Sequence, residues 1–281
     1  MLKKLIGLGF EEIKLQRLEY LEERYADTET HPNRKRATRS KHHNDLWQMI
    51  HKATDCNALL SLCRKELANL LPNQCRQVLR QLARLAFNSE SNAEFRLIRQ
   101  NTELILRLLK RSERVLPCLR PKDLAKFIHS LTHLNIGYPE FYTRCLELLH
   151  GQTDELELLD IGDSALTFAR LMPSGSELLE QYFTAITARI HTCAPEELSS
   201  TEAVASLIAL SLAMVITGYH DDHIFKLVLR VIALHDTLPE TQLRYLYQIR
   251  TALSFEAPEV NFLIPTQLHQ QLRAMLKKQR K

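Results

Sequence analysis

A repeat of about 40 residues constrains the fold of this chain more than any other sequence feature. Its clearest copy spans residues 119–149, and later copies start at Leu159, Leu198 and Leu238, so that the opening leucines follow one another at almost equal intervals. A looser copy begins upstream near Leu70. Self-similarity at a fixed period of this length is typical of proteins built from stacked repeats.

The copy at 119–149 predicts a helical hairpin. Pro121 suits the first turn of a helix, Gly137 predicts the end of that helix, and Pro139 predicts the beginning of a second one. Apolar residues recur between them at helical spacing. They are Leu124, Phe127, Ile128, Leu131 and Leu134. The chain is therefore predicted to be all-α, an α-solenoid of helical hairpin repeats of about 40 residues.

Composition agrees with this fold class. In 281 residues, 45% are hydrophobic, while 7 glycines and 10 prolines leave little room for a fold rich in strands or loops. No uninterrupted apolar run approaches the roughly 20 residues of a membrane span, so we expect a soluble protein. The six cysteines lie mostly within apolar helical stripes, which is typical of buried free thiols in a reducing compartment.

The pattern divides the chain into four segments. Residues 1–26 predict an amphipathic helix, although Glu11 and Glu12 are untypical of a cleaved organellar presequence. Residues 27–44 lose the apolar pattern and predict an unstructured basic arm. Residues 45–262 hold the helical repeats, and residues 263–281 predict a last helix with a basic tail.

Charge is distributed unevenly along the repeats. Lys and Arg outnumber Asp and Glu by 14 to 6 in residues 61–126, whereas the acidic residues lead by 12 to 3 in residues 127–210. This distribution favours a polyanion as partner at one part of the chain and a different partner in the middle. A solvated surface is the plainer interpretation of the acidic residues. They include Asp154, Glu155, Glu157, Asp160, Asp163, Glu177, Glu180, Glu196 and Glu197.

The basic residues are the candidate RNA ligands. Arg76, Arg80 and Arg84 recur every four residues and so share one helix face, although arginine is also an ordinary residue of helix surfaces. Clustered Arg and Lys form salt-sensitive contacts with phosphate. The full candidate set is Arg34, Lys35, Arg36, Arg39, Lys41, Arg76, Arg80, Arg84, Arg107, Lys110, Arg111, Lys122 and Lys126.

Catalytic and metal-binding motifs are missing from the sequence. It contains no phosphate-binding loop, no Gly-x-Ser-x-Gly elbow and no His-Glu-x-x-His zinc motif. His129 and His133 have helical spacing but no accompanying carboxylate, and the acidic residues between His220 and His223 suit a helix cap better than a metal site. We therefore expect no catalysis, cofactor, metal or small-molecule substrate.

The best copy also resembles a known repeat family. The pattern Leu-x-Pro-x-Asp-Leu-Ala-x-Phe-x-x-Ser-Leu-x-x-Leu at 119–134, followed by Gly137-Tyr138, is similar to the repeats of octotricopeptide, heptatricopeptide and FAST-kinase-like proteins. The resemblance extends over residues 70–262, without the RAP domain that many relatives carry.

This resemblance implies a non-catalytic RNA-binding protein of an organelle. Within that class we expect a structural component of the mitochondrial ribosome, located in the matrix, with ribosomal RNA and neighbouring proteins of the assembly as partners. The alternative is a protein-interaction scaffold or bacterial effector that acts in the cytoplasm through its acidic middle repeats.

Overall fold

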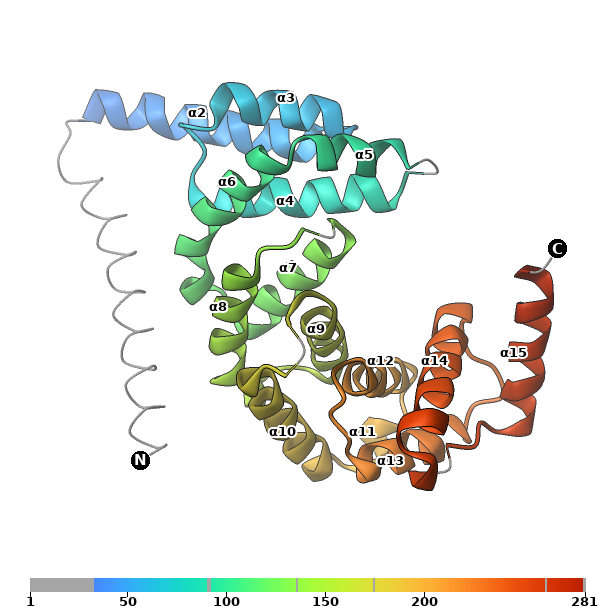
Figure 1. The fold of residues 1–281 in the computed structure, drawn as a ribbon. Coiled ribbons are helices and arrows are strands. Elements are labelled where there is room, and N and C mark those ends of the chain that lie inside the picture. Colours follow the sequence, from blue (N-terminus) through green and yellow to red (C-terminus); the bar gives the residue numbers. More distant parts are fainter. Residues whose placement is uncertain (1–32, 90–91, 135, 174, 261, 280–281) are drawn as a thin grey trace. The chain divides into compact units, whose positions relative to one another are not determined.

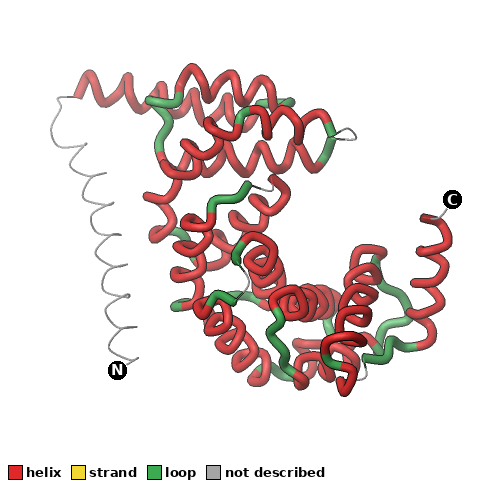
Figure 2. The backbone as a smooth tube through the Cα atoms, in the orientation of Figure 1, coloured by secondary structure: helices red, strands yellow, loops and turns green. Residues whose placement is uncertain are grey.

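The protein is helical throughout the part that the structure describes. The computed structural model describes residues 33–89, 92–134, 136–173, 175–260 and 262–279. Figure 2 shows only helices, loops and turns in these ranges, which confirms the all-α prediction. The amphipathic helix predicted at 1–26 lies outside the described residues, as does the first part of the predicted basic arm.

The chain forms two compact units, of which the first ends at Gly151 and the second begins at Gln152 (Figure 1). The first contains α2 (Asn33–Lys52), α3 (Cys56–Glu66), α4 (Pro72–Phe87), α5 (Ala93–Gln100), α6 (Thr102–Ser112), the 3-10 helix η1 (Glu113–Cys118), α7 (Pro121–Leu134) and α8 (Pro139–His150). The second contains η2 (Thr153–Glu155), α9 (Leu158–Leu171), α10 (Glu177–Thr192), α11 (Pro195–Leu198), α12 (Thr201–Thr217), α13 (Asp222–Ile232), α14 (Glu240–Glu256), η3 (Pro258–Val260) and α15 (Thr266–Gln279).

Helix α4 is central to the first unit. It packs against α2, α3, α5, α6, η1 and α7, and its apolar stripe is buried among them. Two glutamines on the buried side are also almost inaccessible to solvent. Gln74 donates from Nε2 to the backbone carbonyl of His43 at 2.8 Å, and Gln81 donates from Nε2 to that of Ala53 at 3.2 Å. These amide bonds attach α2 and the loop that follows it to α4, because a buried amide needs a partner.

The basic arm is where the structure differs from the sequence prediction. Residues 33–44 belong to α2 instead of forming an unstructured segment. Pro32 is the last proline or glycine before residue 52, and Arg, Lys and Gln are good helix formers. The helix that buries Leu46 and Ile50 therefore extends backward through the basic residues, even though they lack an apolar pattern.

The hairpin predicted at 119–149 corresponds to α7 and α8. The apolar residues of α7 that were predicted to face inward are buried, and Leu131 is 0% exposed. Phe127 of α7 meets Phe141 of α8 edge to face, with ring centroids 6.1 Å apart. The hydroxyl of Tyr142 donates to the backbone carbonyl of Ile136 at 3.1 Å, which connects α8 to the segment that precedes it.

Helix α12 is the most deeply buried helix of the second unit. It packs against α9, α13 and α14, and its side chains from Ala203 to Val215 are almost all buried. Its small and apolar sequence is typical of a helix that lies between neighbours. Ser200 caps its beginning by accepting from the amide of Ala203 at 3.2 Å. Gly218 ends it in the left-handed conformation, with φ of 73°, which glycine adopts without strain.

Candidate nucleic-acid interface

The predicted arginine face of α4 is divided between two depressions in the first unit. Helix α4 begins at Pro72, and the Gln74 side chain accepts from the amide of Leu71 at 2.9 Å, so the first turn is well satisfied. Arg76 lies near this beginning and lines a large hollow. Arg80 and Arg84 lie further along the helix and line a smaller groove against α7.

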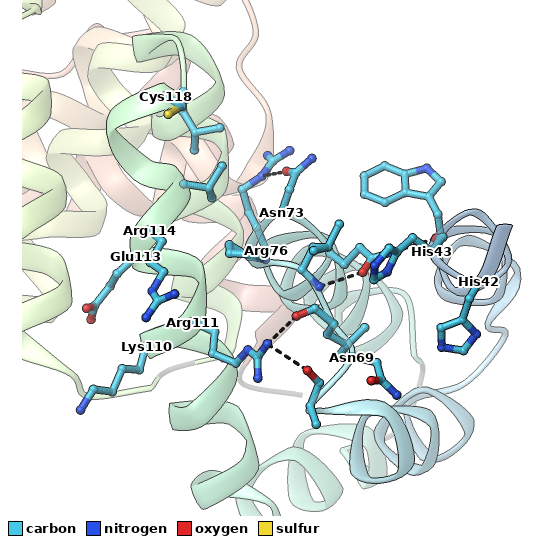
Figure 3. A pocket seen from close by; sticks show the side chains of 18 of the residues that line it. His42, His43, Asn69, Asn73, Arg76, Lys110, Arg111, Glu113, Arg114 and Cys118 are labelled. Atoms are coloured by element: carbon cyan, nitrogen blue, oxygen red, sulfur yellow. Dashed lines mark hydrogen bonds between the residues drawn. The ribbon is translucent and has the colours of Figure 1, made fainter. Parts of the chain in front are cut away.

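The larger depression, which we call the basic hollow, has a volume of about 1340 Å³. Its walls come from α2, the α3–α4 loop, the first turn of α4, the end of α6 and η1 (Figure 3). Glu113 is the only carboxylate among the described residues that line it, and burial raises the pKa of that carboxyl group. The groups that can carry positive charge are His42, His43, Arg76, Lys110, Arg111 and Arg114.

Arg111 has a structural role in this hollow. Its Nη2 donates to the carbonyl of Leu70 at 2.7 Å and to that of Ala68 at 3.4 Å, as Figure 3 shows. These carbonyls belong to the α3–α4 loop, so the guanidinium connects α6 to that loop. Arg111 was predicted as a phosphate ligand, and the structure shows that part of its donor capacity is already used within the protein.

The guanidinium of Arg76 has fewer of its hydrogen-bond donors paired than that of Arg111. Its Nε donates to Oδ1 of Asn73 at 2.9 Å, while its Nη1 is buried and has no hydrogen-bond partner among the described residues. Burial, followed by the charge of Arg80, lowers the pKa of this guanidinium. An anion in the hollow would therefore offset an unfavourable concentration of positive charge.

The smaller depression, the α4–α7 groove, has a volume of about 290 Å³. Arg80 and Arg84 of α4 and Lys126 of α7 contribute its positive charge. Arg84 donates from Nε to Oε1 of Gln81 at 3.1 Å, which fixes the guanidinium at the edge of the groove. The phosphate ligands predicted on α4 and α7 thus meet in one place.

Other predicted ligands are dispersed. Arg107 is exposed and pairs with Glu103 one turn earlier on α6, so its charge is partly offset. Lys122 is half-buried near the beginning of α7. Five residues lie on α2 toward its amino-terminal end, within the helix and not in a flexible arm. They are Arg34, Lys35, Arg36, Arg39 and Lys41.

Three side chains outside the predicted ligand set also contribute to these surfaces. Trp47 is half-buried and lines the basic hollow. Arg114 lines the same hollow from η1. Phe87 lines the α4–α7 groove and is 65% exposed. The sequence could have indicated the position of Phe87. It follows Arg80 by seven residues and therefore lies on the arginine face of the helix and not on the apolar stripe.

The acidic residues that were predicted to form a solvated surface differ in their exposure. Asp154, Glu155 and Glu157 are exposed around η2 and the beginning of α9. Asp160 is different, because it is only 3% exposed. The prediction that it faces solvent is wrong, since α9 is covered along almost its whole first half.

The described residues contain no group of three or more His, Cys, Asp and Glu side chains that could hold a metal ion. The acidic residues after His220 act as predicted for a cap. Asp221 accepts from the amides of His223 and Ile224 at 2.9 and 3.2 Å, at the beginning of α13. No described helix combines the length and the apolar character needed to cross a membrane.

Comparisons with models of protein families, with curated proteins and with solved structures find no match to this chain.

Proposed function

We propose that this chain is a non-catalytic RNA-binding helical-repeat protein and a structural component of the mitochondrial ribosome. The observation that carries the RNA-binding part is the basic hollow, where six side chains that are or can become cationic accompany a single described carboxylate. Positive charge concentrated on one surface binds the phosphates of nucleic acid by releasing counterions. The mitochondrial and ribosomal parts rest on the resemblance of residues 70–262 to organellar repeat proteins.

The repeat architecture belongs to the same proposal. In an α-solenoid the first helices of successive hairpins pack against one another. In the second unit α12 packs against both α9 and α14, and in the first unit α4 packs against α7. These contacts join helices that begin roughly one repeat apart in the sequence, which supports stacked repeats within each unit.

A protein-interaction scaffold is the rival function, and one observation favours it. The second unit exposes carboxylates at Asp154, Glu155 and Glu157 together with large apolar side chains, of which Phe255 is 82% exposed and Leu234 is 72% exposed. Phosphate would be repelled by the carboxylates, whereas a basic protein would be attracted.

Salt dependence of RNA binding tests the proposal. Lys110 and Arg114 are exposed and line the basic hollow, so replacing both with Ala should leave the fold intact. We expect weaker binding and a log-log salt slope reduced by about one unit for each phosphate ligand removed. The matched control is Lys226→Ala with Arg244→Ala, which also removes two exposed charges, each of them paired with a carboxylate.

Identical slopes for wild type, the hollow variant and the control would contradict RNA binding at the hollow. The ribosomal part has its own test. Co-sedimentation of the wild-type chain with mitochondrial ribosomal particles should persist at high salt, and its loss at moderate salt would contradict a stable structural role.

A further inference from the structure

The α4–α7 groove combines fixed positive charge with an exposed aromatic ring. Arg80 and Phe87 are two helical turns apart on α4, with Arg84 between them, so the three side chains follow one face of the helix. Lys126 and Ser130 of α7 line the groove with them. Phe87 is 65% exposed, which is unusual for a phenylalanine beside a helix–helix contact.

The cationic side chains of the groove retain donors for a ligand. Gln81 is 4% exposed and holds Arg84 through Nε, and its own amide is held by the carbonyl of Ala53. The hydrogen bond to Gln81 uses only Nε of Arg84, and the interactions of Arg80 with Arg76 and Asp123 are electrostatic. Arg84 is thus positioned before any ligand arrives, which lowers the ordering cost of binding.

No carboxylate lines this groove among the described residues. Asp123 interacts electrostatically with Arg80, but its Oδ2 already accepts a hydrogen bond from Nε of Arg120 at 2.8 Å. The groove therefore keeps a net positive charge, and it suits an anion that also has an apolar face.

We propose that the α4–α7 groove binds one unpaired nucleotide of the RNA, with the base stacked on Phe87 and the phosphate held by Arg80, Arg84 and Lys126. This inference rests on the proposed RNA-binding function and adds a specific nucleotide site to it. A volume of about 290 Å³ is near the lower end of small-ligand sites. The groove therefore suits one nucleotide and is too small for an RNA double helix. In a duplex the bases are stacked on one another and cannot reach an aromatic side chain.

The test compares an unstructured RNA oligonucleotide of 12 nucleotides with a duplex of the same length. Phe87→Leu keeps an apolar side chain but removes the ring, so the single strand should bind about five- to 150-fold more weakly, the range measured for loss of one stacked base. Duplex binding should not change. Phe87→Trp should retain single-strand affinity, and its indole emission should fall when the oligonucleotide binds, relative to wild type with Trp47 alone.

The matched control is Phe255→Leu, because Phe255 is an exposed phenylalanine of the second unit, 82% accessible. It should bind both RNAs as wild type does. Unchanged single-strand affinity in Phe87→Leu, or equal losses for single strand and duplex, would overturn the nucleotide site. If the Lys110 and Arg114 variant still shows a reduced salt slope in that case, the proposed function stands without this site. Absence of RNA binding by wild type would overturn both.

Discussion

The hydroxyl of Ser206 in α12 accepts a hydrogen bond from the backbone amide of Gly162 in α9 at 3.0 Å. The same hydroxyl donates to the backbone carbonyl of Leu158, four residues before Gly162. A side chain of α12 therefore bonds to the two backbone groups that define one turn of α9. This close approach is possible only because Gly162 has no side chain, since a Cβ there would lie 2.6 Å from Cα and the carbonyl oxygen of Ser206.

Gly162→Ala should therefore destabilise the second unit. Backbone atoms of Ser206 cannot move aside as a flexible side chain would, so α9 and α12 must separate, at a cost of about 1–3 kcal/mol. Urea unfolding followed by circular dichroism measures this. Gly137→Ala is the control, because nothing lies within 4 Å of a Cβ at Gly137. Ser206→Ala should cost less than Gly162→Ala, since Leu158 and Gly162 can bond to each other in a regular helix. The reverse order would contradict the steric explanation.

Leu131→Ala should destabilise the first unit by about 2–5 kcal/mol, because Leu131 is 0% exposed within the α7–α8 hairpin and its removal leaves a cavity. Thermal unfolding is a sufficient measurement. Glu147→Ala is the comparison on α8, where the carboxylate pairs with Arg144 on the surface and should contribute about 1 kcal/mol or less. Equal midpoints for the two variants would mean that the inward face of α7 is misassigned.

His150 should make the first unit sensitive to acid. Burial lowers the pKa of its imidazole, whose Nδ1 has no hydrogen-bond partner among the described residues. The unfolded chain, with a histidine pKa of about 6.5, then binds the proton more tightly than the folded protein. The stabilisation by neutral His150 is present above that pKa and is lost as the pH falls below it. Between pH 7.5 and 5.5, wild type should lose more free energy of unfolding than His150→Gln. His269, whose pKa is also lowered by burial, titrates in both proteins and cancels from this difference. Parallel losses would contradict the role of His150.

Neutralising the exposed carboxylates distinguishes the proposed RNA-binding function from the rival protein-interaction scaffold. Asp154→Asn with Glu155→Gln and Glu157→Gln keeps side-chain size and adds no positive charge. We expect RNA affinity and ribosomal co-sedimentation to persist in this variant, with a small stability loss because acidic groups favour the beginning of α9. Loss of co-sedimentation with RNA affinity retained would instead favour the protein-interaction scaffold.

The sequence predicts helices well and their environments less well. The burial of α12 follows from its composition alone, and Asp221 acts as a cap as its position predicted. The helical conformation of residues 33–44 does not follow from apolar periodicity, because basic residues continue a helix without contributing to a core. The burial of Asp160 could not be predicted either, because nothing in the sequence around a charged residue indicates that neighbouring helices will cover it.

The sequence predicts the basic residues of the candidate site, but it does not predict which of them lie together. The spacing of Arg76, Arg80 and Arg84 indicates one face, yet only the packing of α6, η1 and α7 around α4 divides that face into a hollow and a groove. The use of Arg111 within the protein depends on the carbonyl of Leu70, which is distant in the sequence and belongs to no local pattern.

The amides of Gln74 and Gln81 also decide how the protein would respond to ionic strength. They hold α2 and its following loop through uncharged donors and acceptors, which dissolved ions screen hardly at all. Concentrated salt that displaces a polyanion would therefore leave the helix with Arg34, Lys35 and Arg36 attached to its unit. Dilution would then restore binding at once, with no refolding step, so repeated cycles of washing and reloading should be fully reversible.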